Sequence, residues 1–381
     1  MSSFASTRIV HRLAWLLLAL VWPLIWIGGL VTTYDAGMSV PDWPNTYGYN
    51  LLLYPMSSWL SGPFDIFVEH GHRLLAMVVG FVSIGLLIAA WTRENRFWVV
   101  VLCFGVLLAV IGQGGLGGLR VVLSDQNLAM VHGCVGPAFF ALCVIAMVVT
   151  SRWWMEPEHF EEQQTVATRP SEPAEEQPGT PTTRVVRPTR VRGPRELGAL
   201  VSWMAGFLVV LSFAQLVMGA MLRHASPTTR PSWFAMIVAS HILVAFLLWL
   251  ATVLVWWRIR RCGDLTLSRP SGALVPLVGL QICLGLGTWI VNYGYATFLK
   301  WMPGSAGYLV QAKGFVESFI VTGHVATGSL ILAAATFLLV RVLRSRYRQR
   351  YRQSESTRAA SQPVGDRDDA SGNEEVATAM V

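Results

Sequence analysis

Eight long apolar runs constrain this chain more than any other feature of its sequence. A helix that crosses a membrane needs about 20 predominantly apolar residues. Charged residues make up only 13% of the chain, against about 25% in a typical soluble domain. The runs lie at 13–31, 70–91, 97–117, 128–150, 198–220, 235–257, 272–291 and 316–340. We therefore expect an all-α integral membrane protein with eight transmembrane helices.

The arginines predict how these helices are oriented. They cluster before the first run and after the second, sixth and eighth runs, whereas residues 31–68 contain no Lys or Arg. Because cytoplasmic loops carry the excess of positive charge, both termini are expected in the cytoplasm. The same clustering explains the net charge of +7 without nucleic acid as a partner. No transit peptide is evident, so a bacterial plasma (inner) membrane is expected.

Two polar segments divide the chain. Residues 151–197 are rich in Glu, Pro, Thr and Arg, and such a composition cannot bury enough apolar area to offset the entropy lost on ordering. We expect a disordered cytoplasmic linker there and a disordered cytoplasmic tail at 343–381. The remaining parts are a cytoplasmic N-terminus and two four-helix bundles, at 1–12, 13–150 and 198–342.

The two expected bundles resemble each other in the order of their motifs. AVIGQGGLGG (109–118) ends the third run, and GLQICLGLGTWI (279–290) occupies the seventh. MVHGCVGPAFFAL (130–142) in the fourth run corresponds to VTGHVATGSLILA (321–333) in the eighth. A duplicated four-helix unit explains this order, so the bundles are expected to be pseudo-symmetric. The glycines of the third and seventh runs are interpreted as sites of close helix packing.

Four histidines lie inside the even-numbered runs, and 16 to 19 residues follow each one before its run ends. At 1.5 Å per residue, this places all four at a similar depth, with roughly 24 to 29 Å of helix below them. A single such histidine usually bonds a neighbouring helix, and a structural role stays the alternative. Two per bundle at matched depth favour axial ligation of haem iron. The four are His72, His132, His241 and His324.

The five cysteines lack CxxC spacing, so they predict neither a zinc site nor a disulfide framework.

The second run opens with the sequence EHGHR at 69–73. On a helix Glu69 and His72 share a face, and Arg73 follows Glu69 by one turn. A desolvated carboxylate beside an iron ligand can hold a proton, act as a base or stabilise positive charge. The alternative is a Glu69–Arg73 ion pair that anchors the helix. His70 points elsewhere and is expected at the membrane interface.

Together these motifs resemble the haem A synthase family, over nearly all of residues 12–342. The family oxidises the C8 methyl of haem O to a formyl group, with water as the oxygen source, and so makes haem A for terminal oxidases. The motifs are Glu69-x-x-His72-Arg73, GQGGLGGLRV (112–121), His132, SVPDWPNTYG (39–48), QLVMGAMLRH (215–224), His241 and TGHVATG (322–328).

The resemblance implies different roles for the two halves. The N-terminal half would hold the substrate haem O between His72 and His132, with Glu69 as the catalytic residue. The C-terminal half would hold a haem b cofactor between His241 and His324. The haem propionates would be contacted by Arg73, Arg120, Arg223 and His224, for which interfacial anchoring is the alternative.

The resemblance also implies partners: haem O synthase and the cytochrome oxidase assembly machinery, within membrane lipid. Whether the chain forms a homo-oligomer is left open. Many bacterial relatives carry a cysteine pair in the first outer loop, and this chain has none there, which leaves its electron acceptor open. Two other functions fit the histidines: a di-haem electron carrier of the cytochrome b type, and a non-catalytic haem transport or assembly protein. Glu69 favours the enzyme.

Overall fold

The computed structural model describes residues 2–155, 197–226, 228–295, 301, 305 and 314–361. Within these ranges eight helices are long and apolar enough to cross a membrane, which confirms the prediction of an all-α membrane protein with eight spans. They are α1 (Ser2–Thr33), α3 (Phe64–Arg93), α4 (Phe97–Val122), α5 (Gln126–Val149), α8 (Ala199–Arg223), α9 (Pro231–Cys262), α10 (Leu265–Tyr293) and α11 (Phe315–Ser361). The shorter elements are η1 (Ala36–Met38), α2 (Met56–Leu60) and α6 (Arg152–Met155).

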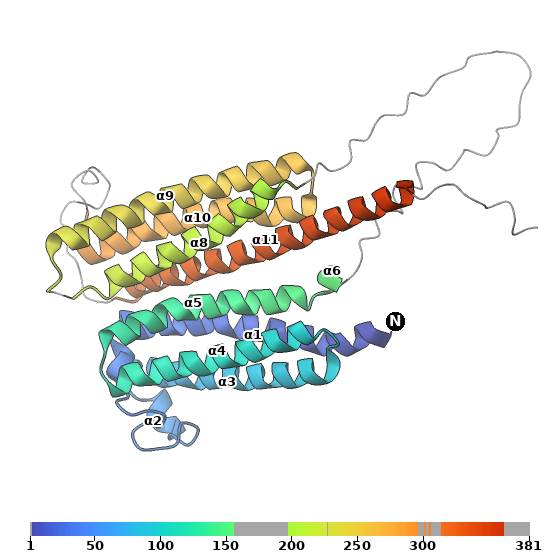
Figure 1. Ribbon diagram of the computed structural model, residues 1–381. Helices are drawn as coiled ribbons and strands as arrows, with labels where there is room; N and C mark the ends of the chain where they lie inside the picture. Colours follow the sequence, from blue (N-terminus) through green and yellow to red (C-terminus); the bar gives the residue numbers. More distant parts are fainter. Residues whose placement is uncertain are drawn as a thin grey trace, which may run out of the picture.

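The long helices pack in two groups of four (Figure 1). In the first group α1 contacts α3 and α5, and α4 contacts the same two helices; in the second, α8 and α10 each contact α9 and α11. The groups meet where α11 contacts α5 and α1, and where α8 contacts α5. This division follows the predicted four and four, while the pseudo-symmetry of the two bundles stays a prediction. Below, the end that carries α2 is called the α2 end, and the end that carries α6 is called the linker end.

Local sequence sets where several helices begin and end. The Asp125 carboxylate accepts hydrogen bonds from the backbone N–H groups of Asn127 and Leu128, at 2.6 and 3.2 Å, and so caps α5. Asp264 caps α10 in the same way. Such caps satisfy backbone donors that have no partner within the helix. Gly263 ends α9 in the left-handed conformation, with φ of 78°, which glycine adopts without steric cost.

The ends of the chain differ from the prediction. Helix α11 continues to Ser361, so the expectation of a disordered tail is wrong for residues 343–361. No Gly or Pro interrupts 329–361, and Arg344 and Arg348 donate hydrogen bonds to the carbonyl oxygens of Trp154 and Trp153, at 2.9 and 2.7 Å. Residues 2–12 of the expected cytoplasmic N-terminus are helical, because α1 begins at Ser2, and their location in the cytoplasm stays a prediction. Residues 156–196 of the expected linker and 362–381 of the expected tail lie outside the described residues.

Each group has its own apolar core. Leu17, Leu86 and Phe140 belong to the core of the first group, and Leu208 and Leu338 to that of the second. These residues lie nearer the linker end than the four histidines, which follow the start of their helices by six to ten residues. The packed cores therefore support the histidine level from one side of the membrane.

Candidate functional site: two histidine pairs

The structure brings the four histidines together as two pairs. His72 of α3 faces His132 of α5, with the ring centroids 6.5 Å apart. His241 of α9 faces His324 of α11, with the ring centroids 6.3 Å apart. All four helices begin at the α2 end, so both pairs lie toward that end of the bundle. These are the pairs that the family resemblance implies.

Both separations suit a metal ion placed between the rings. An imidazole nitrogen binds a transition metal at about 2 Å, so two rings on opposite sides of one ion have centroids about 6 Å apart. The Nδ1 atom of each ring is shielded from solvent, and the imidazoles lie near the backbone of Leu24, Gln113, Gln215 and Gln281, respectively. The described residues also contain no cluster of three or more His, Cys, Asp or Glu side chains that could bind a metal alone. A two-histidine site therefore fits an ion whose other ligands come from a macrocycle such as haem.

A glycine of a neighbouring helix faces each imidazole. A Cβ atom added to any of these glycines would lie 2.9 to 3.4 Å from the Cε1 atom of the histidine. Any larger residue would therefore push against the ring, and glycine lets the imidazole lie against the backbone of the next helix. The contacts are Gly28–His72, Gly117–His132, Gly219–His241 and Gly285–His324.

Three of the histidines are also held through their backbone. The Nε2 atoms of three glutamines donate hydrogen bonds of 2.8 Å to histidine carbonyl oxygens, in the pairs Gln113–His132, Gln215–His241 and Gln281–His324. Each glutamine precedes by four residues the glycine that faces the same histidine, whereas Leu24 stands four residues before Gly28. Sequence reasoning missed this unit. The signal was a Gln-x-x-x-Gly spacing that recurs in three odd-numbered spans.

The remaining glycines of the third span differ in role. The interpretation of close packing holds for Gly118, where a Cβ atom would overlap the Trp43 indole. It does not hold for Gly114 and Gly115, because a Cβ atom there meets nothing within 4 Å. A glycine-rich run alone does not tell which of its members face a neighbour.

Glu69 lies on α3 one turn before His72 and is 1% exposed. Its Oε2 atom accepts a hydrogen bond of 2.8 Å from the Val40 N–H, and its Oε1 atom accepts one of 2.9 Å from Arg73 Nη2. The ion pair that sequence analysis gave as the alternative for Glu69 is therefore present. The carboxylate has a second partner besides Arg73, because the Val40 N–H, in the loop between α1 and α3, also donates a hydrogen bond to it.

Arg73 anchors that loop over the α2 end. Its Nη1 atom donates to the carbonyl oxygens of Asp42 and Asn45, at 2.7 and 3.0 Å, and its Nη2 atom donates to the Val40 carbonyl at 2.8 Å. With the bond to Glu69, the guanidinium makes four hydrogen bonds within the protein. This occupation speaks for the anchoring alternative at Arg73 rather than for a propionate contact.

Asp42 closes the turn of the same loop. Its two carboxylate oxygens accept hydrogen bonds of 2.8 Å from the backbone N–H groups of Tyr47 and Gly48. Burial alone would raise the pKa of the Asp42 carboxyl, but the backbone donors together with the positive charge of Arg73 hold the pKa below its ordinary value. Asp42 thus stays ionised, and the loop stays closed, at neutral pH.

His70, predicted at the membrane interface, is covered by protein. It is only 2% exposed, because the loop folds back over it. Its Nδ1 atom lies 3.0 Å from the Thr46 hydroxyl, and its ring packs against Tyr54 and Trp59. The position of a histidine in a helix gives no information about a loop that returns to cover it.

Arg120 and Arg223 lie at the α2 ends of α4 and α8. Arg223 Nη2 donates to the Gly29 carbonyl at 2.8 Å and to the Thr33 hydroxyl at 2.7 Å, whereas its Nη1 atom is buried without a partner among the described residues. The Nε atom of Arg120 is likewise buried without a hydrogen-bond partner among the described residues. Because an unsatisfied buried donor is costly, both arginines suit an anionic group of a ligand.

His224 follows Arg223 at the end of α8 and is half-buried. Burial lowers the pKa of its imidazole, and the positive charges of Arg223 and Arg120 lower the pKa further. His224 is therefore neutral at pH 7, and it would contact an anion by hydrogen bonding rather than as a cation.

Comparison with known proteins connects this geometry to a family. The family model COX15-CtaA, described as cytochrome oxidase assembly protein, matches residues 11–171, which include Glu69, His72 and His132. This part of the chain is similar to that family. The second histidine pair lies beyond the matched residues.

Two curated proteins named Heme A synthase are similar to this chain. The protein of Symbiobacterium thermophilum is 30% identical over 151 residues, which are 39% of this chain and 42% of that protein. The protein of Shouchella clausii is 30% identical over 142 residues, which are 36% of this chain and 42% of that protein. The matched part of the chain thus spans about two fifths of the length of these relatives.

Proposed function

We propose that this protein is a haem A synthase, a membrane oxidoreductase that converts the C8 methyl of haem O to a formyl group with water as the oxygen source. The single observation that carries the proposal is the His72–His132 pair with the buried Glu69 carboxylate one helical turn from His72. All three residues lie in the part of the chain that matches the COX15-CtaA family. The similarity to two proteins named Heme A synthase supports the same reaction.

The two pairs take different haems in this proposal. His72 and His132 hold the substrate haem O, and His241 and His324 hold the cofactor haem b. Haem b supplies the redox step that takes electrons from the reaction, since amino-acid side chains do not carry such chemistry themselves. Arg120, Arg223 and His224 offer hydrogen-bond donors to haem propionates, and two of the three have a buried donor atom that the described residues leave without a partner.

Glu69 supplies the electrostatics of the reaction. Oxidation of a methyl group next to a conjugated ring leaves positive charge at that carbon, and a fixed carboxylate in a dry site stabilises this charge strongly. Arg73 and the Val40 N–H hold both carboxylate oxygens in place before the reaction begins.

We also propose the membrane topology that the positions of the arginines predict. The α2 end lies at the outer face of a bacterial plasma membrane. The linker end and both termini lie on its cytoplasmic side. The N-terminal bundle is the substrate domain and the C-terminal bundle the cofactor domain. Haem O synthase would supply the substrate, and cytochrome oxidase assembly would consume the product.

Haem analysis tests the proposal directly. The chain is expressed with haem O synthase in cells that make no haem A, and the extracted haems are separated by chromatography. We expect haem A in these extracts and none from cells that lack the chain. Haem b and haem O without haem A would instead support the di-haem electron carrier, for which the Glu69–Arg73 ion pair would be a purely structural contact.

A further inference from the structure

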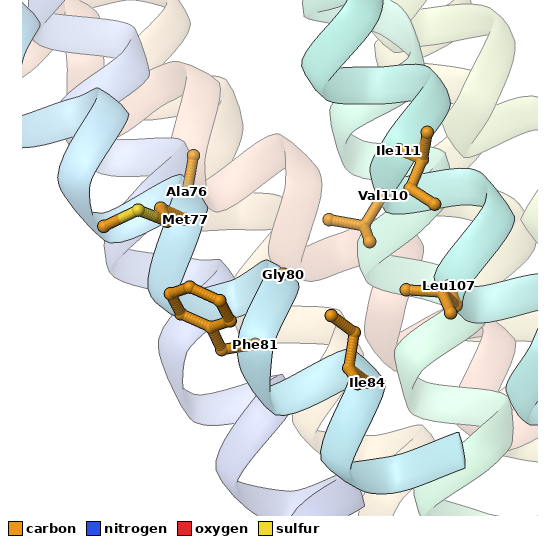
Figure 2. Close-up of a pocket in the computed structure, with 8 residues that line it drawn as sticks. All are labelled: Ala76, Met77, Gly80, Phe81, Ile84, Leu107, Val110 and Ile111. Carbon is orange, nitrogen blue, oxygen red and sulfur yellow. The ribbon is translucent and has the colours of Figure 1, made fainter. Parts of the chain in front are cut away.

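An apolar hollow opens between α3 and α4 on the linker side of His72. Its volume is about 310 Å³, at the lower end of the range for small-molecule sites. Five residues of α3, between Ala76 and Ile84, and three of α4, between Leu107 and Ile111, line it. Figure 2 shows Phe81 and Ile84 on one side and Leu107 and Val110 on the other.

The hollow begins close to the level of the first histidine pair, on its linker side. Ala76 follows His72 by one turn of α3, and Val110 precedes Gly117, which faces His132, by two turns of α4. From His72 to Ile84 the helix advances roughly 18 Å at 1.5 Å per residue. The hollow is an apolar groove on the surface of α3 and α4, since Phe81 and Ile111 are 60% and 61% exposed, and it runs from one turn beyond His72 toward the linker end.

The second half has bulk at the corresponding place. Gly80 follows His72 by eight residues, and Trp249 follows His241 by eight. A Cβ atom on Gly80 would meet nothing within 4 Å, whereas the Trp249 indole nitrogen lies 4.0 Å from a Cβ atom built on Gly279 of α10. Gly279 of α10 stands at the position that Ile111 has in α4. Each precedes by six residues the glycine that faces a histidine, which is Gly285 in α10 and Gly117 in α4. The second half thus has the large Trp249 side chain at the position where the first half has Gly80, which has no side chain.

We propose that the α3–α4 hollow holds the long isoprenoid side chain of haem O, and that Trp249 excludes such a chain from the second pair. The proposal rests on the proposed function and deepens it. Haem O differs from haem b by this apolar chain in place of a small vinyl group. On this proposal the hollow and Trp249 are the features that keep the substrate at the first pair and haem b at the second.

The selection acts through shape rather than hydrophobicity. An isoprenoid chain is as apolar as the lipid around it, so entering the hollow removes no apolar surface from water and the gain comes from packing. A large side chain at position 80 would take the space of the chain and prevent haem O from reaching the imidazoles. Haem b has no such chain, so its binding would not change.

A competition experiment tests this selection in the full-length protein in lipid nanodiscs. His241→Ala and His324→Ala remove the second pair, and the protein is offered equal amounts of haem O and haem b. The bound haem is extracted and measured by chromatography. We expect Gly80→Trp to lower the ratio of bound haem O to bound haem b by about tenfold or more, as forcing bulk into a filled site does.

Gly85→Trp is the matched control on the same helix. A Cβ atom at Gly85 also meets nothing within 4 Å, but Gly85 does not line the hollow, so its ratio should equal that of the parent. The reverse change, Trp249→Gly in a protein that lacks His72 and His132, should let the second pair retain haem O.

The possible outcomes separate the two proposals. If the parent protein binds haem O and Gly80→Trp leaves the ratio unchanged, the hollow does not hold the isoprenoid chain and the inference is overturned. If the parent binds neither haem while its helices remain folded by circular dichroism, the proposed function itself fails.

Discussion

Individual side chains at the first histidine pair are held before any ligand is present. Glu69 is fixed at both oxygens, and each imidazole rests against a glycine of the next helix. Such contacts set the position of a reactive group to within a few tenths of an ångström, which electrostatic catalysis requires. Two substitutions separate the role of charge from the role of position.

Glu69→Gln keeps the size of the side chain and removes its charge. We expect the rate of haem A formation to fall by about 10²-fold, the usual cost of losing one preorganised electrostatic group, while haem remains bound. Haem A in extracts measures the rate, and the absorption spectrum of the purified protein measures binding. A variant with unchanged haem A yield would show that Glu69 only anchors Arg73.

Gly117→Ala tests the contact between glycine and imidazole. The added Cβ atom would lie 3.1 Å from His132 Cε1, so the ring must move and haem should be lost from the first pair alone. The haem content per protein, measured by absorbance, should fall toward half. Gly114→Ala is the control on the same helix, because its Cβ atom meets nothing within 4 Å; equal loss from both variants would contradict the role of Gly117.

At the scale of elements, the loop from Ser39 to Gly48 closes the α2 end of the first group. Arg73 binds it from α3, and Asp42 binds its turn from within. Trp43 of this loop packs on Gly118 of α4. One loop thus covers the tops of two helices that carry site residues.

The Asp42 turn gives this loop a dependence on pH. The pKa of Asp42 is lowered in the folded protein, so its bonds are fully present above the ordinary aspartate pKa of about 4 and are lost as the pH falls through the lowered value. Hydrogen exchange of residues 40–49, corrected for intrinsic rates, should lose protection below pH of about 4. Asp42→Ala should show low protection at every pH; a protected loop in this variant would contradict the assignment.

The sequence predicts elements better than it predicts contacts between them. The apolar runs and the matched depth of His72 and His132 follow from local composition and helix rise, so both could be predicted. The burial of His70 depends on a loop that returns from residue 46, and the helix at 343–361 depends on contacts to Trp153 and Trp154. Such distant contacts leave no local pattern.

At the scale of the whole molecule, α11 joins the two groups. It belongs to the second group, yet it contacts α1 and α5 of the first. Near the linker end, the guanidinium of Arg341 lies 4.2 Å from the centre of the Trp153 ring, and that of Arg344 lies 4.9 Å from the centre of the Trp154 ring. At the α2 end, Arg223 donates to α1, and the hydroxyl groups of Thr33 and Thr322 lie 3.2 Å apart.

From these contacts we expect the two halves to associate without the peptide connection between them. Two polypeptides expressed from separate genes, one ending at residue 155 and the other beginning at 197, should assemble in the same membrane and copurify through a tag on either one. Arg341→Ala with Arg344→Ala should weaken the association without unfolding either fragment. Fragments that never associate would mean that the linker, rather than the contacts of α11 with α1 and α5, holds the two halves together. Fragments that do associate would let each haem be loaded in its own half before the halves are joined.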